Sequence, residues 1–246
     1  MTQKRIGNRM AKEAGIRLNK YISDAGICSR READRYVEAG RVKINDHVAS
    51  LGEKILPGDV VYVDGKKVEE KNSLTMIVFN KPVGVECTCD RSNPDNIIDY
   101  LHYPERLIYV GRLDKNSHGL LLMTNDGDLS NKIAKSCENH EKEYVVKVNR
   151  PITEEFLTGM RKGVPILNTV TKPCRVEPID EDTFRIVLTQ GLNRQIRRMT
   201  KVFGYTVVDL KRIRVMNIKL ENVKEGTYRK ATKEEIDILF GTLGID

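Results

Sequence analysis

Residues 110–127 read VGRLDKNSHGLLLMTNDG, a polar turn between two apolar stretches. The apolar stretches predict two short buried strands, at 107–110 and 120–124, and a glycine stands at each end of the turn. One carboxylate, Asp114, lies inside the turn. Loops between rigid strands tend to carry binding and catalytic groups, which makes Asp114 a candidate for chemistry. The alternative is a turn-forming aspartate whose side chain accepts hydrogen bonds from nearby amides.

The composition favours a polyanionic partner and argues against several classes of protein. The 246 residues include 42 basic and 35 acidic side chains, for a net charge of +7, which favours a polyanionic partner. Five cysteines form no C-x-x-C pair, so neither a zinc site nor a disulfide framework is indicated, and reduced cytoplasmic thiols are expected. No apolar run is long enough to span a membrane, and the basic start contains no signal core.

The N-terminal part of the chain is expected to form a flexible basic arm at residues 1–15 and a separate small domain at residues 16–74. Apolar spacing predicts one short helix over residues 17–25. Ser29, followed three residues later by glutamate, predicts the capped start of a second helix that ends at a glycine. Residues 41–45 then alternate as a strand, and residues 60–68 predict a hairpin with its turn at 64–65.

The same region closely resembles the S4 RNA-binding module. The resemblance rests on RLNKY at 17–21, CSRREA at 28–33, GRV at 40–42 and IN at 44–45. It implies an RNA-facing side that contains Arg17, Lys20, Arg30, Arg31, Arg35 and Arg41. Charge alone is equally compatible with an ordinary solvated face.

Residues 75–246 show a different pattern, which predicts a second domain. Strand-like runs at 76–79, 143–148 and 184–189 are interleaved with helices near 129–135 and 154–162. Strands and helices mixed without βαβ spacing predict an α+β domain with a mixed, largely antiparallel sheet flanked by helices.

A helix predicted after Gly191 carries a basic stripe. At about 100° per residue, the basic residues fall on one face and apolar residues on the other. The basic face comprises Arg194, Arg197, Arg198 and Lys201. Residues 191–219 contain eight basic residues and one acidic residue, a density that suits contacts with an RNA backbone. A solvated stripe is the alternative.

The turn of the opening stretch resembles the first motif of the RsuA-type pseudouridine synthases. The matching residues are GRLD at 111–114 and GLLLMTNDG at 119–127. The resemblance implies that Asp114 is the catalytic nucleophile. It also implies that Arg112 fills the space that the extruded base leaves, a role that suits a flat cationic side chain.

Two further motifs match the same family. KEY at 142–144 implies that Tyr144 lies under the target uracil, where its ring can stack on an extruded base. A core tyrosine with a bonded hydroxyl is the alternative. QGLNRQIRRM at 190–199 implies that Arg197 pairs with Asp114, and an adjacent guanidinium would favour the ionised carboxylate. The stripe residues Arg194, Arg198 and Lys201 are expected to bind RNA.

The resemblance implies isomerisation of uridine to pseudouridine in structured RNA, with no cofactor and no metal. Within the family, the chain is most similar to the F-type synthases of large-subunit ribosomal RNA, through residues 80–84, 95–99, 140–144 and 163–167. The expected partner is therefore 23S ribosomal RNA, with 16S ribosomal RNA or tRNA as alternatives. The enzyme is expected to be a cytoplasmic monomer without a membrane partner.

Two other classes of protein compete with this interpretation. An S4-containing methyltransferase would need a glycine-rich cofactor loop, and the chain contains no G-x-G sequence. A non-catalytic ribosome-binding or assembly factor would need the basic surfaces, but it would not need Asp114, Tyr144 and Arg197 together.

Overall fold

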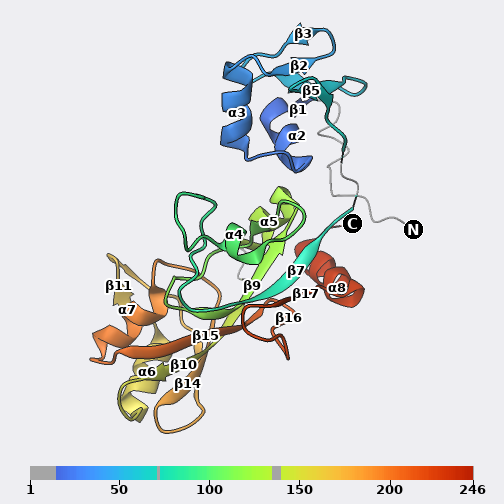
Figure 1. The fold of residues 1–246 in the computed structure, drawn as a ribbon. Helices are drawn as coiled ribbons and strands as arrows, with labels where there is room; N and C mark the ends of the chain where they lie inside the picture. Colours follow the sequence, from blue (N-terminus) through green and yellow to red (C-terminus); the bar gives the residue numbers. More distant parts are fainter. Residues whose placement is uncertain (1–14, 71–72, 135–139, 246) are drawn as a thin grey trace. The chain divides into compact units, whose positions relative to one another are not determined.

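The computed structural model describes residues 15–70, 73–134 and 140–245. Apart from its last residue, the expected basic arm lies outside this part of the chain. The chain divides into two compact units, which Figure 1 shows. The first unit comprises Met1–Thr75 with the short segments Tyr103–Ile108 and Thr124–Leu129, and the second comprises Met76–His102, Tyr109–Met123 and Ser130–Asp246.

The first unit contains two helices and a small antiparallel sheet that share one apolar core. The helices are α2 (Leu18–Asp24) and α3 (Arg30–Glu38). The sheet has the order β3 (His47–Val48), β2 (Val42–Ile44), β5 (Val61–Val63) and β6 (Lys66–Lys67), and β1 (Ile16–Arg17) pairs with β4 (Lys54–Ile55). The two predicted helices and the hairpin are confirmed.

Local chemistry explains where these elements start and turn. Ser29 caps α3, because its hydroxyl accepts from the Glu32 amide at 3.2 Å. The Glu32 carboxylate instead accepts from the Tyr36 hydroxyl at 3.3 Å, so the reciprocal bond expected of a capping box is not what this side chain makes. Asp64 and Gly65 have φ of 51° and 73°, the left-handed pair that a tight hairpin between β5 and β6 requires.

Within the described residues, nine strands of the second unit form a mixed sheet. Its main order is β13 (Arg175–Pro178), β14 (Thr183–Leu188), β10 (Lys142–Val148), β15 (Val207–Val215), β9 (His118–Thr124), β7 (Met76–Lys81) and β17 (Tyr228–Lys230). In addition, β8 (Ile108–Tyr109) pairs with β9, and β16 (Ile218–Lys219) pairs with β15. A hairpin of β11 (Pro165–Ile166) and β12 (Thr169–Val170) lies apart from this sheet.

Helices flank the sheet, as the α+β prediction requires. They are α4 (Ile97–Leu101), α5 (Gly127–Ala134), α6 (Glu154–Lys162), α7 (Gln195–Val202) and α8 (Lys233–Leu243). Thr153 caps α6 by accepting from the Phe156 amide at 3.2 Å. One prediction was wrong in detail: Arg194 precedes α7 in a left-handed conformation, with φ of 50°, so it is not part of the helical stripe.

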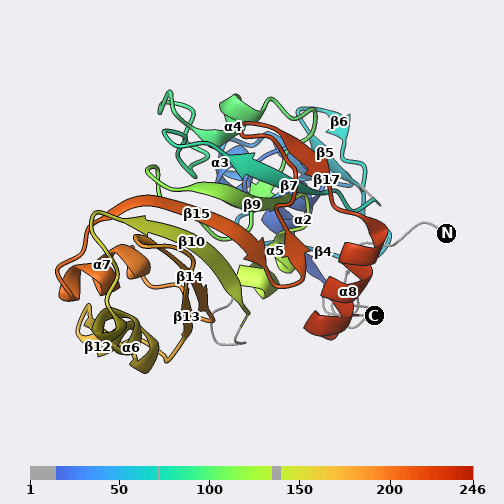
Figure 2. The same ribbon diagram turned by 90° about the horizontal axis from the view of Figure 1, so that it is seen from below.

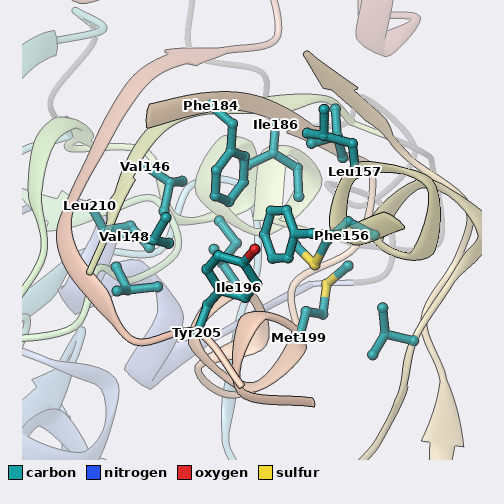
Figure 3. Close-up of a cluster of buried hydrophobic side chains, with 14 of the residues drawn as sticks. Val146, Val148, Phe156, Leu157, Phe184, Ile186, Ile196, Met199, Tyr205 and Leu210 are labelled. Carbon is teal, nitrogen blue, oxygen red and sulfur yellow. The ribbon is translucent and has the colours of Figure 1, made fainter. Parts of the chain in front are cut away.

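The main core lies between α6, α7 and one face of strands β10, β13, β14 and β15 (Figures 2 and 3). Phe156 lies at its centre, with ring centroids 4.3 Å from Tyr205 and 5.4 Å from Phe184. Val146 and Val148 alternate toward this core from β10. Tyr144 lies on the same face of β10 and packs at the edge of the core.

One parallel pairing places the middle of the 110–127 stretch next to strand β15. His118 and Gly119 on β9 pair with Lys211 and Arg212 on β15. Gly119 has φ of 100°, and a Cβ there would lie 2.3 Å from the Arg212 carbonyl oxygen. Only glycine allows this close approach, which sets the position of the turn that precedes β9.

Candidate active site

Asp114 lies in a tight turn between β8 and β9, as predicted. The Ser117 amide donates to the Asp114 carbonyl at 3.0 Å, which closes the turn. The buried Leu113 anchors its first half, and the Leu113 amide donates to Cys87 Sγ at 3.4 Å. The Asp114 side chain is 36% exposed, so the carboxylate is held in place and accessible at the same time.

Arg197 of α7 fixes the second half of this turn. Its guanidinium donates to the Asn116 carbonyl at 2.7 Å, to Ser117 Oγ at 3.3 Å and to the Val207 carbonyl at 3.2 Å. Burial lowers the pKa of the Arg197 guanidinium and Arg194 acts in the same direction, whereas Asp114 opposes both. Arg197 therefore lies within electrostatic range of the carboxylate and holds the backbone that carries it.

The ion pair of Asp114 is made with a different arginine. Arg194 Nη1 lies 3.8 Å from Asp114 Oδ2, whereas no ion pair joins Asp114 to Arg197 within the described residues. Arg194 was expected to contact RNA as part of a helical stripe. The left-handed backbone places it before the helix, with its guanidinium beside the turn.

Tyr144 is in register with Gly119, the residue that follows the turn, through the intervening strand β15. It pairs with Arg212 on β15, and Arg212 pairs with Gly119 on β9, so Tyr144 lies two strands away from the end of the turn, roughly 10 Å. Its ring is half-buried, and its hydroxyl has no hydrogen-bond partner in the described part of the chain. A purely structural tyrosine usually has its hydroxyl bonded, so this one is available to a substrate.

Arg112 lies two residues before Asp114 and is exposed. In the described part of the chain it makes no ion pair, which leaves its guanidinium available. Beneath the turn lies Lys81, which is fully buried; its ammonium donates to the Pro82 carbonyl at 2.8 Å and the Val85 carbonyl at 2.7 Å. Burial lowers the pKa of Lys81, and Cys87 and Asp114 act against that shift.

Sequence reasoning missed the contacts that hold the turn from its other side. The Gly84 amide donates to the Lys115 carbonyl at 2.9 Å, and Lys115 Nζ forms an ion pair with Asp95 at 2.6 Å. Gly84 and Asp95 belong to the stretches 80–84 and 95–99, which were noted only as finer points of family resemblance. Their contacts span 20 residues or more, so no local pattern could have revealed them.

Next to the turn, His118 connects β9 to two acidic residues. Its Nε2 lies 3.0 Å from Asp209 Oδ1, and its Nδ1 lies 3.6 Å from Glu225 Oε2. The His118 side chain is 14% exposed, so this histidine is largely buried next to the turn. These contacts add a further link between the end of the turn and β15.

The remaining predicted RNA-binding residues differ in whether they are already bound by other protein groups. Arg198 and Lys201 are exposed on α7, and Arg198 donates to the carbonyl and side chain of Asn193 at 3.0 and 3.1 Å. In the first unit, Arg41 is held by Asp64 at 2.6 Å and Lys20 by Asp24 at 2.6 Å. The other S4 residues predicted to face RNA are Arg17, Arg30, Arg31 and Arg35, all of them exposed.

A polar concavity of about 360 Å³ is lined by residues of the sheet and none of the turn: Glu143, Arg175, Glu177, Arg185, Val187, Arg214 and Lys219. Its three arginines have carboxylate partners: Arg214 pairs with Glu143 at 2.6 Å and with Glu141 at 2.9 Å, Arg175 pairs with Glu141 at 2.9 Å, and Arg185 pairs with Glu143 at 3.5 Å. Because its arginines already have carboxylate partners, we regard this groove as structural.

The described residues offer neither a metal-binding cluster nor a helix that could span a membrane. No group of three or more His, Cys, Asp and Glu side chains is arranged to hold a metal ion. Over the same residues, the helices are too short or too polar to cross a bilayer.

Comparison with known proteins agrees with this geometry. The sequence matches the family described as RNA pseudouridylate synthase over residues 75–201 and the S4 domain over residues 16–61. The chain therefore belongs to the RNA pseudouridylate synthases and carries an S4 domain ahead of the catalytic region. The inferred enzyme class, the S4 resemblance and the α+β fold are confirmed.

Individual relatives cover nearly the whole chain. Dual-specificity RNA pseudouridine synthase RluF of Escherichia coli strain K12 is 51% identical over 233 residues, covering 94% of this chain and 80% of that protein. Ribosomal large subunit pseudouridine synthase B of Bacillus subtilis strain 168 is 31% identical over 229 residues, covering 89% and 93%. A crystal structure of a pseudouridylate synthase aligns with a TM-score of 0.67 and 29% identity, covering 91% of this chain and 99% of that one.

Proposed function

We propose that this enzyme isomerises a specific uridine of 23S ribosomal RNA to pseudouridine, with Asp114 as the nucleophile. The observation that carries the proposal is a partly exposed carboxylate on a turn that is fixed from several sides. Arg197 holds the Asn116 carbonyl at 2.7 Å, and the Gly84 amide holds the Lys115 carbonyl at 2.9 Å. Such preorganisation is what an attack on one ribose carbon requires.

The reaction replaces the C1′–N1 glycosidic bond of uridine by a C1′–C5 bond. The product is an isomer of the substrate, so no atoms are gained or lost overall. Asp114 attacks ribose C1′ as the C1′–N1 bond breaks, or it initiates loss of the base to leave a glycal. The base then rotates, and C5 bonds to C1′ as the bond between C1′ and Asp114 breaks or, on the glycal route, as C2′ regains the proton it lost. The proton on C5 is then lost and N1 gains a proton. An ionised carboxylate is needed at the first step, because the charged oxygen is the attacking atom.

Tyr144 and Arg112 are the proposed contacts of the target nucleotide. The half-buried ring of Tyr144 offers a face on which an extruded uracil can stack, and its unbonded hydroxyl can reach the nucleotide. The exposed guanidinium of Arg112 can stack in the gap that the base leaves. Tyr144→Phe should keep affinity and lower the single-turnover rate, whereas Tyr144→Ala should lower both.

Relatives support the choice of RNA. The Bacillus subtilis relative is named for the large ribosomal subunit. The Escherichia coli relative is named as a dual-specificity enzyme, which is compatible with a second RNA substrate, and tRNA is one of the alternatives that the sequence leaves open. The S4 domain and the exposed arginines of α3 supply the phosphate contacts that either RNA needs.

The substrate is tested by mapping pseudouridine in 23S ribosomal RNA and tRNA from cells that lack this protein and from cells in which it is restored. One 23S site should lose its pseudouridine and regain it on complementation. Purified enzyme should then release tritium from a 23S transcript that contains [5-³H]uridine. Loss confined to 16S ribosomal RNA or tRNA would overturn the 23S proposal, while loss at no RNA site would overturn the function.

The nucleophile is tested by Asp114→Asn, which keeps size and most hydrogen bonds but removes the attacking charge. Tritium release should fall below detection, while RNA binding is not weakened. Asp90→Asn removes another exposed carboxylate of the second unit and should leave the rate unchanged. Activity of Asp114→Asn within about tenfold of the parent would contradict the assignment.

A further inference from the structure

Two arginines lie close to Asp114, and they are held very differently. Arg197 donates to three acceptors, the Asn116 and Val207 carbonyls and Ser117 Oγ, at 2.7 to 3.3 Å. Arg194 has one partner in the described part of the chain, Asp114, at 3.8 Å. That separation is too long for a hydrogen bond, so the Arg194 ion pair rests on charge alone.

Arg194 is also the more accessible of the two. Its side chain is 45% exposed, and it precedes the first turn of α7 in a left-handed backbone conformation, with φ of 50°. Arginine adopts this conformation only at an energetic cost, and such residues are concentrated at functional sites. An exposed ion pair without hydrogen bonds is weak and readily exchanges its partner.

RNA brings a stronger competitor for Arg194. A phosphate offers two charged oxygens that a guanidinium can bind with two parallel hydrogen bonds, which the 3.8 Å contact with Asp114 does not provide. Arg197 cannot exchange in the same way, because leaving its acceptors would release the turn that carries Asp114. Of the two guanidiniums, Arg194 alone is free to move from carboxylate to phosphate.

We propose that Arg194 is a positioning residue with two alternating partners. In the free enzyme it holds the Asp114 carboxylate, and on RNA binding it turns to a backbone phosphate and leaves the carboxylate to the fixed charge of Arg197. RNA binding thereby unmasks Asp114 only when a substrate strand is present. The inference rests on the proposed function, in which Asp114 is the nucleophile.

The charges around Asp114 make this exchange specific to Arg194. Lys81 is buried under the turn and bonded to two carbonyls, and Lys115 is paired with Asp95 at 2.6 Å. Arg198, four residues after Arg194, is bonded to Asn193 and therefore provides a matched control. Replacing Arg198 by glutamine removes one positive charge from the same segment and leaves the ion pair of Asp114 intact.

The test is a double-mutant cycle on RNA affinity. Binding of an unmodified 23S ribosomal RNA transcript is measured for the parent, for Arg194→Gln and for Arg198→Gln, each with and without Asp114→Asn. If Asp114 competes with phosphate for Arg194, Asp114→Asn should tighten binding about two- to fivefold in the parent and in Arg198→Gln. In Arg194→Gln the same change should have little effect, and Arg194→Lys should restore part of the coupling.

Equal tightening by Asp114→Asn in the Arg194→Gln and Arg198→Gln backgrounds would overturn the exchange, because the carboxylate would then act only by general repulsion of RNA. No tightening in the parent would overturn it as well. The cycle measures binding alone, so its failure leaves the nucleophile assignment intact. An active Asp114→Asn enzyme with normal coupling would instead overturn the nucleophile and keep the exchange.

Discussion

The helices α3 and α7 both carry basic residues at helical spacing, but the structure uses them in different ways. On α3, Arg31 and Arg35 are exposed and form no ion pair within the described residues. On α7, Arg197 is half-buried and donates to the backbone of the turn that carries Asp114. A charge pattern thus predicts which face of a helix is basic, whereas burial decides what the charges contact.

The physical reason is the cost of burying a cation. A guanidinium that leaves water must find acceptors, and Arg197 finds them in two carbonyls and a hydroxyl. Its loss therefore costs the geometry of the turn as well as a charge. The arginines of α3 keep their hydration until RNA arrives, so their loss costs only phosphate contacts.

Among the arginine variants that test this comparison, Arg197→Lys should have the largest effect. An ammonium cannot reach the three acceptors of the planar guanidinium at once, so Asp114 should lose its position although the charge remains. We expect the single-turnover rate to fall about 100-fold with a smaller change in affinity.

A matched control for this substitution is Arg161→Lys. Arg161 Nε also donates to a carbonyl, that of Val176 at 2.8 Å, but lies outside the site. The single-turnover rate of the Arg161→Lys variant should stay at the parent value. A normal rate for Arg197→Lys, measured by quenched single turnover, would show that the turn needs no orienting guanidinium.

The next effect in size is expected from Arg31→Gln combined with Arg35→Gln. Losing two phosphate contacts should weaken binding of a 23S transcript about tenfold and flatten the slope of log affinity against log salt by about 0.7 to 0.9 per contact. The turnover rate at saturating RNA should change less than the affinity. An unchanged salt slope would remove α3 from the RNA-binding surface.

Arg41 refines this comparison within the same domain. Arg41 is exposed, as Arg31 and Arg35 are, but Asp64 already binds it at 2.6 Å. Arg41→Gln should therefore reduce the salt slope less than loss of either α3 arginine. A larger reduction than that of the α3 double variant would mean that RNA displaces Asp64 and that existing ion pairs do not predict which arginines bind.

The smallest effect is expected where an arginine serves the fold alone. Arg229 binds both carboxylate oxygens of Glu235, at 2.6 and 2.7 Å, and these bonds hold the pKa of the Glu235 carboxyl below its usual value. Glu235→Gln should lower the free energy of unfolding by about 1 kcal/mol at neutral pH. Activity at a temperature well below the melting point should not change.

The pH dependence of this effect has a definite sign. A carboxyl whose pKa is depressed in the folded state stabilises the protein above its unfolded pKa, about 4.3, and loses that contribution as the pH falls through the lower folded value. The stability gap between parent and Glu235→Gln should therefore be full at neutral pH and close below about pH 4. A gap that persists in acid, measured by thermal unfolding, would assign it to packing.

The sequence alone determined the features that depend on neighbouring residues. Short-range spacing, glycines and capping side chains predict the turn that carries Asp114, the strands on either side of it, the two S4 helices and the Ser29 cap of α3. Motif resemblance added the enzyme class, because a run such as GRLD is read without knowledge of its surroundings.

Only the tertiary structure decided which groups meet at the site. It placed Arg194 before α7 and beside Asp114, it directed Arg197 to a backbone 81 residues away, and it joined Gly84 to the same turn. These contacts depend on how distant strands pair and on which polar groups burial leaves in need of partners. Periodicity carries no information about such partners, since it describes one element at a time.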